Sequence, residues 1–396
     1  MNVDVLIFGG GGAGLWLLDE LNRRRFRALL VEHRALGAGQ TIASQGILHG
    51  GLKYMLGGIP SRSTKAVAEM TELWRACLTG RGEPDLRGVR VLSPCCYLWR
   101  SESLVSRAAL TAANLVLRTS VEKTAMHDRP AALADCPGEV LRVEEQVIDT
   151  ASLLRVLADA HAKRIMWIGE EGKVGFSTSQ PGWVEEVRLL PVPGGAPIAV
   201  RPSTIVFAAG EGNEELRRQV ALLGVVMQRR PLHMVMVRGI LPQLFGHCVH
   251  GRRTRVTITS VVDSGGRTVW QLGGEIAEKG VEMSPSDLVT FAKRELSEVL
   301  PGVHLHDMEW ATYRINRAEG KSTAGLRPDG PAWRRDGSVI TAWPTKLVLA
   351  PALARMIADS LGEPPREPSG SDQAPLDWPL PDVAQPPWET QTEWQN

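Results

Sequence analysis

The sequence predicts an α/β chain in which a parallel sheet flanked by helices is interleaved with a second, α+β part built on an antiparallel sheet. Residues 3–32 follow the order strand, glycine turn, helix, strand, which is one βαβ unit of a parallel sheet. Extended runs at Pro231–Arg238, Thr254–Val262 and Thr268–Gly273 follow one another, as in an antiparallel sheet. At 396 residues the chain is long enough for two packed domains.

A glycine turn joins the first strand, Val3–Phe8, to the first helix. Gly9, Gly11 and Gly14 have the G-x-G-x-x-G spacing. In this pattern the first glycine permits a tight turn, the second lets a pyrophosphate approach the backbone, and the third lets the helix pack on the strand. The helix N-terminus then offers N–H groups and the positive end of its dipole to the phosphates.

Glu32 ends the second strand, where an acidic side chain accepts hydrogen bonds from the ribose of an adenosine. A carboxylate at this position disfavours a 2′-phosphate, so NADP is not expected. Because the strand, the helix and the acid agree with the glycine spacing, the sequence predicts a dinucleotide site rather than a plain glycine-rich turn.

Composition excludes several classes of protein. The 45 Lys and Arg residues balance 44 Asp and Glu residues, which gives no reason to expect nucleic acid as a partner. The five cysteines are an odd number without a C-x-x-C pair, so neither a disulfide framework nor a metal site is predicted. No signal peptide and no apolar run of about twenty residues is recognised, which predicts a cytoplasmic protein and leaves peripheral membrane contact open.

Later segments return the chain to the first sheet. Thr204–Gly210 is a β-run ending in small residues, which allow close approach of a ligand at the nucleotide crevice. Ser338–Leu361 combines a short strand, a turn at Trp343–Thr345 and a long apolar helix. Beyond Gly362 the chain is rich in proline and acidic residues and carries three tryptophans, which predicts an extended arm that docks on this subunit or on a partner.

Two further segments carry a resemblance to a known family. Gly37–Ser44 matches a G-x-G-[TS]-x-x-S pattern, and Ile47–Tyr54 has the sequence ILHGGLKY. The chain, to about Gly362, resembles the D-amino-acid oxidase and glycerol-3-phosphate dehydrogenase superfamily of FAD-dependent oxidoreductases. In that family the first pattern lies beside the flavin pyrophosphate and isoalloxazine, so the resemblance implies FAD rather than NAD. We expect the flavin to be held without a covalent bond.

The resemblance implies a Rossmann-like FAD-binding domain interleaved with a substrate domain. The expected division is residues 1–85, 140–225 and 326–362 for the first, 86–139 and 226–325 for the second, and 363–396 for the arm. The expected cofactor contacts are Gly9, Gly11, Gly12, Ala13, Gly14, Glu32, His33, Gly39, Gln40, Thr41, Ser44, Gln45, Gly46, Ala208, Ala209, Gly210, Thr345, Lys346 and Leu347.

The family motifs also suggest site residues. Ile47–Tyr54 is similar to I-H-G-G-L-R-Y of glycerol-3-phosphate dehydrogenases and to S-x-G-V-I-H-A-G of L-2-hydroxyglutarate oxidising enzymes, and Gly46 stands where the former have lysine. Trp310–Arg317 falls where relatives carry W-x-G-x-R, whose arginine holds a carboxylate or phosphate. Pro344–Leu347 is similar to G-K-L-T, which implies that Lys346 stabilises negative charge at flavin N1 and O2.

The expected reaction is hydride removal from a carbon that bears a hydroxyl or an amine. His49 is the predicted general base, with a backbone-bonded structural histidine as the alternative reading and His233 as the alternative base. Arg314 is the predicted anion clamp, because a guanidinium binds a carboxylate or phosphate through two hydrogen bonds. Arg317 and Tyr54 are further predicted substrate contacts.

His247 and His250 have a spacing found in metal sites, but without an evident third ligand we interpret them as surface or core histidines. The leading functional hypothesis is oxidation of a 2-hydroxy acid or polyol phosphate. The alternatives are an amine or amino-acid oxidase of the same fold, and a flavoprotein subunit of a larger complex. Oxygen, a quinone or another protein remains open as the electron acceptor.

Overall fold

A computed structural model describes residues 1–50, 62–100, 121–191, 196–250, 253–322, 328, 330–364 and 378–396. The predicted substrate contact Tyr54 lies outside these residues. In the described part, no helix is long and apolar enough to span a membrane.

The first sheet is mainly parallel and has the order β17-β18-β11-β1-β2-β8. β1 (Asn2–Phe8) and β2 (Ala28–Glu32) form its centre, as the βαβ unit predicts. The other strands are β8 (Ile165–Trp167), β11 (Ile198–Phe207), β17 (Ala332–Asp336) and β18 (Val339–Trp343), and a hairpin of β9 (Lys173–Gln180) and β10 (Trp183–Leu190) extends from β11.

Both faces of this sheet are covered, which explains why β1 has apolar residues in succession. Val5 and Ile7 pack on the helical side, whereas Leu6 and Phe8 pack toward the β9–β10 hairpin and α6. The helices are α1 (Gly12–Arg23), α3 (Arg62–Leu78), α5 (Thr150–Ala160), α6 (Asn213–Gln219) and α9 (Ala350–Leu361). α6 ends at Gln219, shortly before Ala221, which takes a left-handed conformation with φ of 59°.

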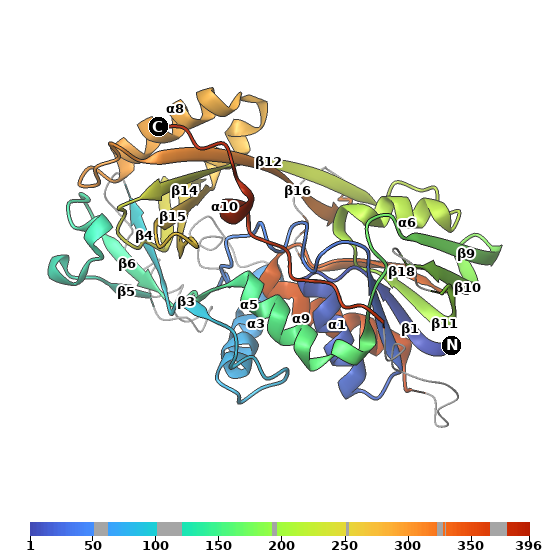
Figure 1. Ribbon diagram of the computed structural model, residues 1–396. Coiled ribbons are helices and arrows are strands. Elements are labelled where there is room, and N and C mark those ends of the chain that lie inside the picture. Colours follow the sequence, from blue (N-terminus) through green and yellow to red (C-terminus); the bar gives the residue numbers. More distant parts are fainter. Residues whose placement is uncertain are drawn as a thin grey trace.

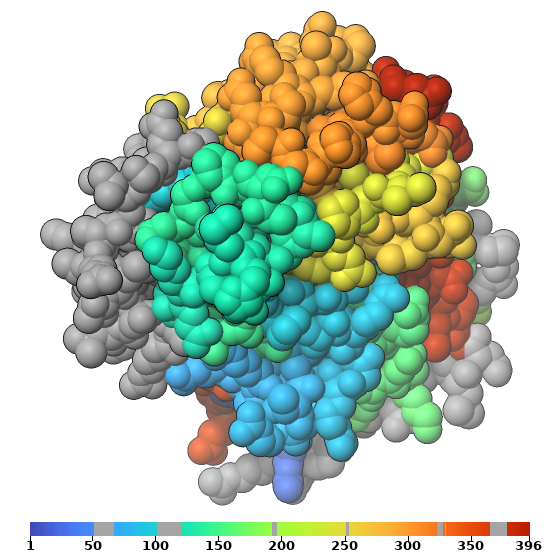
Figure 2. Space-filling view, turned by 90° about the vertical axis from the view of Figure 1, so that its left-hand side faces the viewer, coloured from blue at the N-terminus to red at the C-terminus, as the bar shows by residue number. Residues whose placement is uncertain are grey.

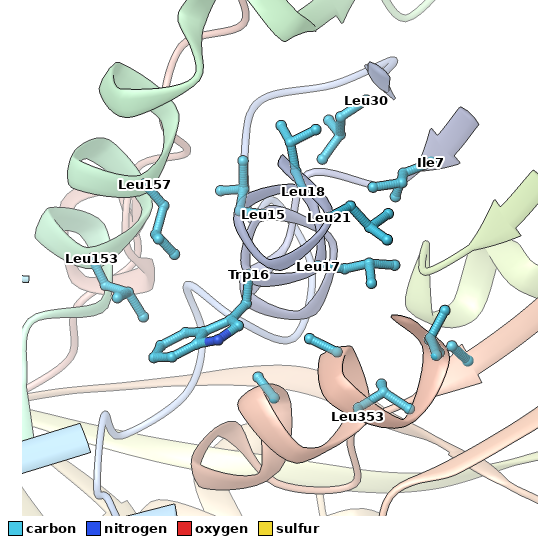
Figure 3. Close-up of a cluster of buried hydrophobic side chains, with 14 of the residues drawn as sticks. Ile7, Leu15, Trp16, Leu17, Leu18, Leu21, Leu30, Leu153, Leu157 and Leu353 are labelled. Atoms are coloured by element: carbon cyan, nitrogen blue, oxygen red, sulfur yellow. The ribbon is translucent and has the colours of Figure 1, made fainter. Parts of the chain in front are cut away.

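α1 is the centre of the helical layer. Figure 3 shows Leu153 and Leu157 of α5 and Leu353 of α9 around Leu15, Trp16, Leu17 and Leu18 of α1. Trp16 contacts Trp74 of α3 with ring centroids 4.5 Å apart. This apolar packing fixes the start of α1, and with it the glycine turn, against the sheet.

The second sheet has the order β16-β12-β15-β14-β13-β4-β6-β5 and is antiparallel except where β13 runs parallel to β4. Its strands are β4 (Cys96–Arg100), β5 (Val121–Lys123), β6 (Val140–Val143), β12 (Met227–Gly239), β13 (Gly246–His250), β14 (Arg253–Val262), β15 (Thr268–Gly273) and β16 (Glu309–Gly320). The predicted fold class, a parallel α/β part with an interleaved antiparallel sheet, is confirmed.

Two helices, α7 (Glu275–Lys279) and α8 (Pro285–Val299), accompany the second sheet, and α8 covers its outer face (Figure 1). Trp99, Trp270 and Trp310 are fully buried in this part. On the face in Figure 2, the teal segment around residues 121–145 lies against the orange α8 region, with the light-blue residues of α3 to β4 below. β6 pairs with β4, so the sheet includes residues beyond the predicted boundary at 139, and the division into domains stays a prediction.

The C-terminal arm lies across both sheets (dark red in Figure 1). Val383 forms a parallel bridge with Leu36 beside the first sheet, and Gln395 forms an antiparallel bridge with Trp310 of β16. A short helix, α10 (Pro387–Thr390), lies between these two contacts. The arm therefore docks on its own subunit, as one of the two predictions stated, while docking on a partner stays a prediction.

Candidate active site

The glycine turn brings three elements into close contact. A Cβ atom at Gly14 would lie 1.9 Å from the carbonyl oxygen of Gly9, and one at Gly9 would lie 2.6 Å from the Cα of Ala209. Gly9 also has φ of 109°, which glycine adopts at no steric cost. Only glycine therefore lets β1, the first turn of α1 and the end of β11 approach this closely.

Glu32 holds the turn from the end of β2. Its Oε2 accepts a hydrogen bond from the N–H of Gly10 at 2.7 Å, and its Oε1 accepts from the N–H groups of His33 and Arg34 at 2.8 and 2.9 Å. Burial raises the pKa of Glu32, but contacts with His33 and the backbone N–H groups outweigh burial and hold the pKa below its ordinary value. Glu32 is therefore an anion that orders the backbone around it.

A cavity of about 440 Å³ lies over the glycine turn. At Gly39 and Gly210 a Cβ atom would meet nothing within 4 Å, so these glycines leave open space at its wall. The predicted cofactor contacts that line it are Gly9, Gly11, Gly12, Ala13, Glu32, His33, Gly39, Gln40, Thr41, Ser44, Ala208, Ala209, Gly210, Lys346 and Leu347.

The other predicted cofactor residues lie nearby. Gly14 is in the helix-strand contact beneath the turn, and Gln45, Gly46 and Thr345 line a second cavity of about 440 Å³. Thr345 has φ of 67° and donates its hydroxyl to the carbonyl of Gly330. A β-branched residue in the left-handed region is strained, and such strain is common at functional sites.

Thr41 holds the segment that follows β2 against α1 through a hydrogen bond. Its Oγ1 accepts a hydrogen bond from the N–H of Gly12 at 3.1 Å, and its carbonyl accepts from the hydroxyl of Ser44 at 2.8 Å. Tyr313 of β16 donates its hydroxyl to the carbonyl of Ala43 at 3.0 Å. The segment that separates the two cavities is thus held by both parts of the molecule.

Asn213 is a residue that the sequence reasoning missed. It is fully buried at the start of α6, its Oδ1 accepts from the N–H of Ala209 at 2.8 Å, and its Nδ2 donates to the carbonyl of Ala342 at 3.1 Å. The side chain thereby links the ends of β11 and β18 at the edge of the first cavity. The sequence signal for it was an asparagine three residues after the small residues Ala208–Gly210.

The second cavity lies between the first sheet and the second. It shares Gln40, Ser44, Lys346 and Leu347 with the first cavity, so the two adjoin. Its remaining wall includes side chains from β12, β14 and β16, together with His49. The residues from the strands are Leu232, Met234, Arg253, Thr254, Thr257, Ile315 and Arg317.

Among the predicted catalytic and substrate residues that the structure describes, Arg314 and His233 line neither cavity. Arg314 donates to the carbonyls of Val281 and Met283 at 2.7 and 3.0 Å. His233 is 1% exposed and bonds through its two ring nitrogens to the Gly280 carbonyl and the Thr312 hydroxyl, each at 3.0 Å. Burial lowers the pKa of His233, which fits a structural, neutral imidazole.

Strand alternation explains both orientations. Successive side chains on a strand point to opposite faces, so Ile315 and Arg317 reach the second cavity whereas Arg314 points to the other face. His233 lies directly opposite Arg314 in the pairing of β12 with β16 and shares its face. Arg314 and His233 therefore face away from both cavities in this structure, and their roles as anion clamp and base stay predictions.

Arg317 is the predicted arginine that lies in the second cavity. Its Nη2 is 3.3 Å from Oε1 of Glu278, and its side chain is 18% exposed. Lys346, on the loop after β18, lines both cavities. Positive charge is thus present at the junction of the cavities and on the strand wall.

His49 lies beside two groups that the sequence reasoning did not bring to it. Oε2 of Glu145 is 3.4 Å from Nδ1 of His49 and 3.6 Å from Nε2 of His247. Burial raises the pKa of Glu145, but the neighbouring imidazoles of His247 and His49 hold it well below its ordinary value. His247 was interpreted as a surface or core residue, and it is buried in the core against this cluster.

Comparison with known proteins assigns the chain to a family. Residues 4–360 match the model of the family described as FAD dependent oxidoreductase (DAO). The chain belongs to this family. It is 40% identical over 394 residues to a probable FAD-dependent oxidoreductase, PA4991, of Pseudomonas aeruginosa, covering 98% of each chain. The protein is therefore an FAD-dependent oxidoreductase, and its cofactor is FAD.

Solved structures agree in fold. The crystal structure of PA4991 from Pseudomonas aeruginosa superposes with a TM-score of 0.81 at 36% identity over 98% of both chains. Glycine oxidase from Geobacillus kaustophilus gives 0.62 at 19% identity, covering 92% of this chain and 95% of that one. L-α-glycerophosphate oxidase from Mycoplasma pneumoniae, with FAD bound, gives 0.63 at 16% identity over the full length of both. The latter two show a shared fold and leave the substrate open.

Proposed function

We propose that this oxidoreductase removes a hydride from a CH–OH carbon of a small anionic substrate, a 2-hydroxy acid or a polyol phosphate. The observation that carries the proposal is the second cavity, which adjoins the cavity over the glycine turn and contains both a cationic and a proton-accepting side chain. Arg317 is the cation and His49 the proton acceptor.

The first cavity fits FAD in its chemistry. The N-terminus of α1 at Gly11 and Gly12 supports the pyrophosphate, and the open wall at Gly39 and Gly210 admits groups that a Cβ would exclude. Glu32 lies where the adenosine ribose is recognised in such sites. Bound FAD supplies the hydride acceptor, and a cation such as Lys346 opposes the negative charge that develops on reduction.

Substrate recognition follows from the second cavity. Arg317 binds the carboxylate or phosphate through two hydrogen bonds, and its contact with Glu278 holds the guanidinium in place beforehand. His49 accepts the hydroxyl proton as the hydride leaves the carbon. Leu232, Met234 and Ile315 supply the apolar wall that excludes water from the reacting carbon.

An amine or amino-acid substrate is the second candidate. Glu275 and Glu278 line the same cavity, and carboxylates there would favour a cationic ammonium group. A neutral amine loses a hydride without a general base, whereas an alcohol needs its proton removed. The role of His49 therefore separates the two candidates.

Anaerobic mixing of the holoenzyme with matched substrates tests the proposal. A 2-hydroxy acid, the corresponding 2-amino acid and the corresponding alcohol without carboxylate are compared, with polyol phosphates alongside, and loss of flavin absorbance is recorded. We expect reduction by a hydroxy acid or a polyol phosphate. Reduction by the amino acid alone would favour the second candidate, and equal reduction by the neutral alcohol would contradict the anion clamp. Remixing the reduced enzyme with oxygen or a quinone then identifies the electron acceptor.

A further inference from the structure

Backbone pairing brings Glu145 to His49. Residues 46–50 run beside residues 144–148, with the Leu48 N–H donating to the Gln146 carbonyl at 2.8 Å and the Ile148 N–H donating to the Gly46 carbonyl at 3.0 Å. In this arrangement Oε1 of Glu145 accepts from the N–H of Gly50 at 2.7 Å. The other oxygen, Oε2, then faces Nδ1 of His49 at 3.4 Å.

His247 approaches the same oxygen from the second sheet. It lies on β13 opposite Thr257 of β14, and its Nδ1 is 2.8 Å from the Thr257 hydroxyl. Its Nε2 is 3.6 Å from Oε2 of Glu145. The two imidazole rings have centroids 5.6 Å apart, so the carboxylate oxygen lies against both rings. The cluster thus joins a loop of the first part of the chain to two strands of the second sheet.

The carboxylate of Glu145 is buried, so its charge needs partners inside the protein. The side chains of Glu145 and His247 are 3% and 1% exposed, whereas that of His49, which reaches the second cavity, is 19% exposed. A buried carboxylate without partners is costly, and N–H donors are the groups that stabilise its charged form. An N–H at Nδ1 of His49 satisfies this need and leaves the lone pair of that ring on Nε2.

We propose that Glu145 is a positioning residue that holds His49 in the Nδ1–H tautomer, with His247 holding the shared carboxylate oxygen from the other side. This inference rests on the proposed function, in which His49 accepts the hydroxyl proton. The substrate O–H bond breaks, its proton binds at Nε2 of His49, and the C–H electron pair leaves as a hydride to FAD. Glu145 then balances the charge of the imidazolium.

The same three residues are also a candidate cation site, because one ligand atom from each lies within 4.8 Å of the others. A bound metal would occupy the nitrogen that the proposal assigns to a proton. Metal content of the purified holoenzyme therefore decides between the two arrangements. One equivalent of metal that is lost in His247→Gln would overturn the proposal.

Nitrogen-15 spectra of ring-labelled histidines test the tautomer without a substrate. His49→Gln assigns the His49 signals, and we expect an Nδ1–H ring in the wild-type holoenzyme. Glu145→Gln should abolish this preference and Glu145→Asp should retain it, while Glu144→Gln, next to Glu145 and paired with Arg75, should leave it unchanged. An unchanged tautomer in Glu145→Gln would overturn the proposal.

Kinetics with a substrate from the anaerobic panel provide the second readout. Glu145→Gln should slow flavin reduction by about a hundredfold, the scale of a lost general base, with the substrate dissociation constant unchanged. Flavin content and circular dichroism of each variant verify folding. A changed dissociation constant at an unchanged rate would contradict the proposal. If no substrate reduces the flavin, the proposed function is contradicted. The tautomer inference is then still tested by the nitrogen-15 spectra.

Discussion

Arg314 and Arg317 occupy the same strand, β16, yet only Arg317 reaches the second cavity, while Arg314 binds the carbonyls of Val281 and Met283 on the opposite face. The two arginines lie an odd number of residues apart, and side chains on a strand alternate between faces. The pair thus offers a site residue and a matched control that differ in orientation and share residue type and strand.

Gly14 is expected to be intolerant of a methyl group. Gly14→Ala would place a Cβ 1.9 Å from the Gly9 carbonyl oxygen, so α1 must move away from β1. We expect a loss of about 3 kcal/mol in the free energy of unfolding, the upper range for overpacking, and weaker FAD retention. Gly224→Ala, where a Cβ meets nothing within 4 Å, is the control and should change stability by less than about 0.5 kcal/mol. Denaturant unfolding measures both, and equal stability of the two variants would disprove the close contact.

Glu32 should make stability depend on acid pH. Its pKa is lower in the folded state than the ordinary value of 4.5, so its contribution is fully present above that value and is lost as the pH falls through the folded pKa. Glu32→Gln should therefore lower the free energy of unfolding at neutral pH by about 1–3 kcal/mol. The difference from wild type should shrink below pH 4.5, as measured by unfolding across that range. A difference that stays constant with pH would contradict the assignment.

The C-terminal arm should support the FAD site from a distance. Leu36 exchanges backbone hydrogen bonds with Asp382 and Ala384, and the next residue, Gly37, lines the first cavity. Removing residues 378–396 should lower the melting temperature by about 2–4 °C. The same truncation should raise the FAD dissociation constant about tenfold, which corresponds to about 1.4 kcal/mol.

Single substitutions on the arm refine this test. Trp378→Ala removes a hydrogen bond from Nε1 to the Trp167 carbonyl and should reproduce part of the FAD loss. Leu380→Ala, at a half-exposed side chain two residues further on, should behave as wild type. Unaltered FAD affinity in the truncated chain would show that the arm does not order the cofactor segment.

The first βαβ unit could be predicted because its signals are local. Strand, glycine spacing, helix and Glu32 lie within residues 3–32, and the close contacts at Gly9 and Gly14 are the steric reason for that spacing. The second sheet was also predictable as a set of extended runs. Its pairing order joins β13 to β4 across a long stretch of sequence, and no local pattern specifies such a partner.

The second cavity was predictable only in part. The motif around Trp310 indicated an arginine but not which face of the strand looks toward the cofactor, so Arg314 was favoured over Arg317. His49, Glu145 and His247 come from three segments that lie far apart in the sequence, so no short spacing pattern reveals the cluster. Such sites depend on how the two sheets pack together, and the residue pattern of a single strand does not specify that packing.

The most direct test of the account is substrate titration of Arg317→Met and Arg314→Met under anaerobic conditions, with the hydroxy acid or polyol phosphate that reduces the wild-type flavin. The dissociation constant is obtained from the dependence of the flavin reduction rate on substrate concentration. We predict that Arg317→Met raises this constant by about a hundredfold, equivalent to about 2.7 kcal/mol, while Arg314→Met stays near wild type. Equal effects of the two substitutions, or a larger effect of Arg314→Met, would contradict the account.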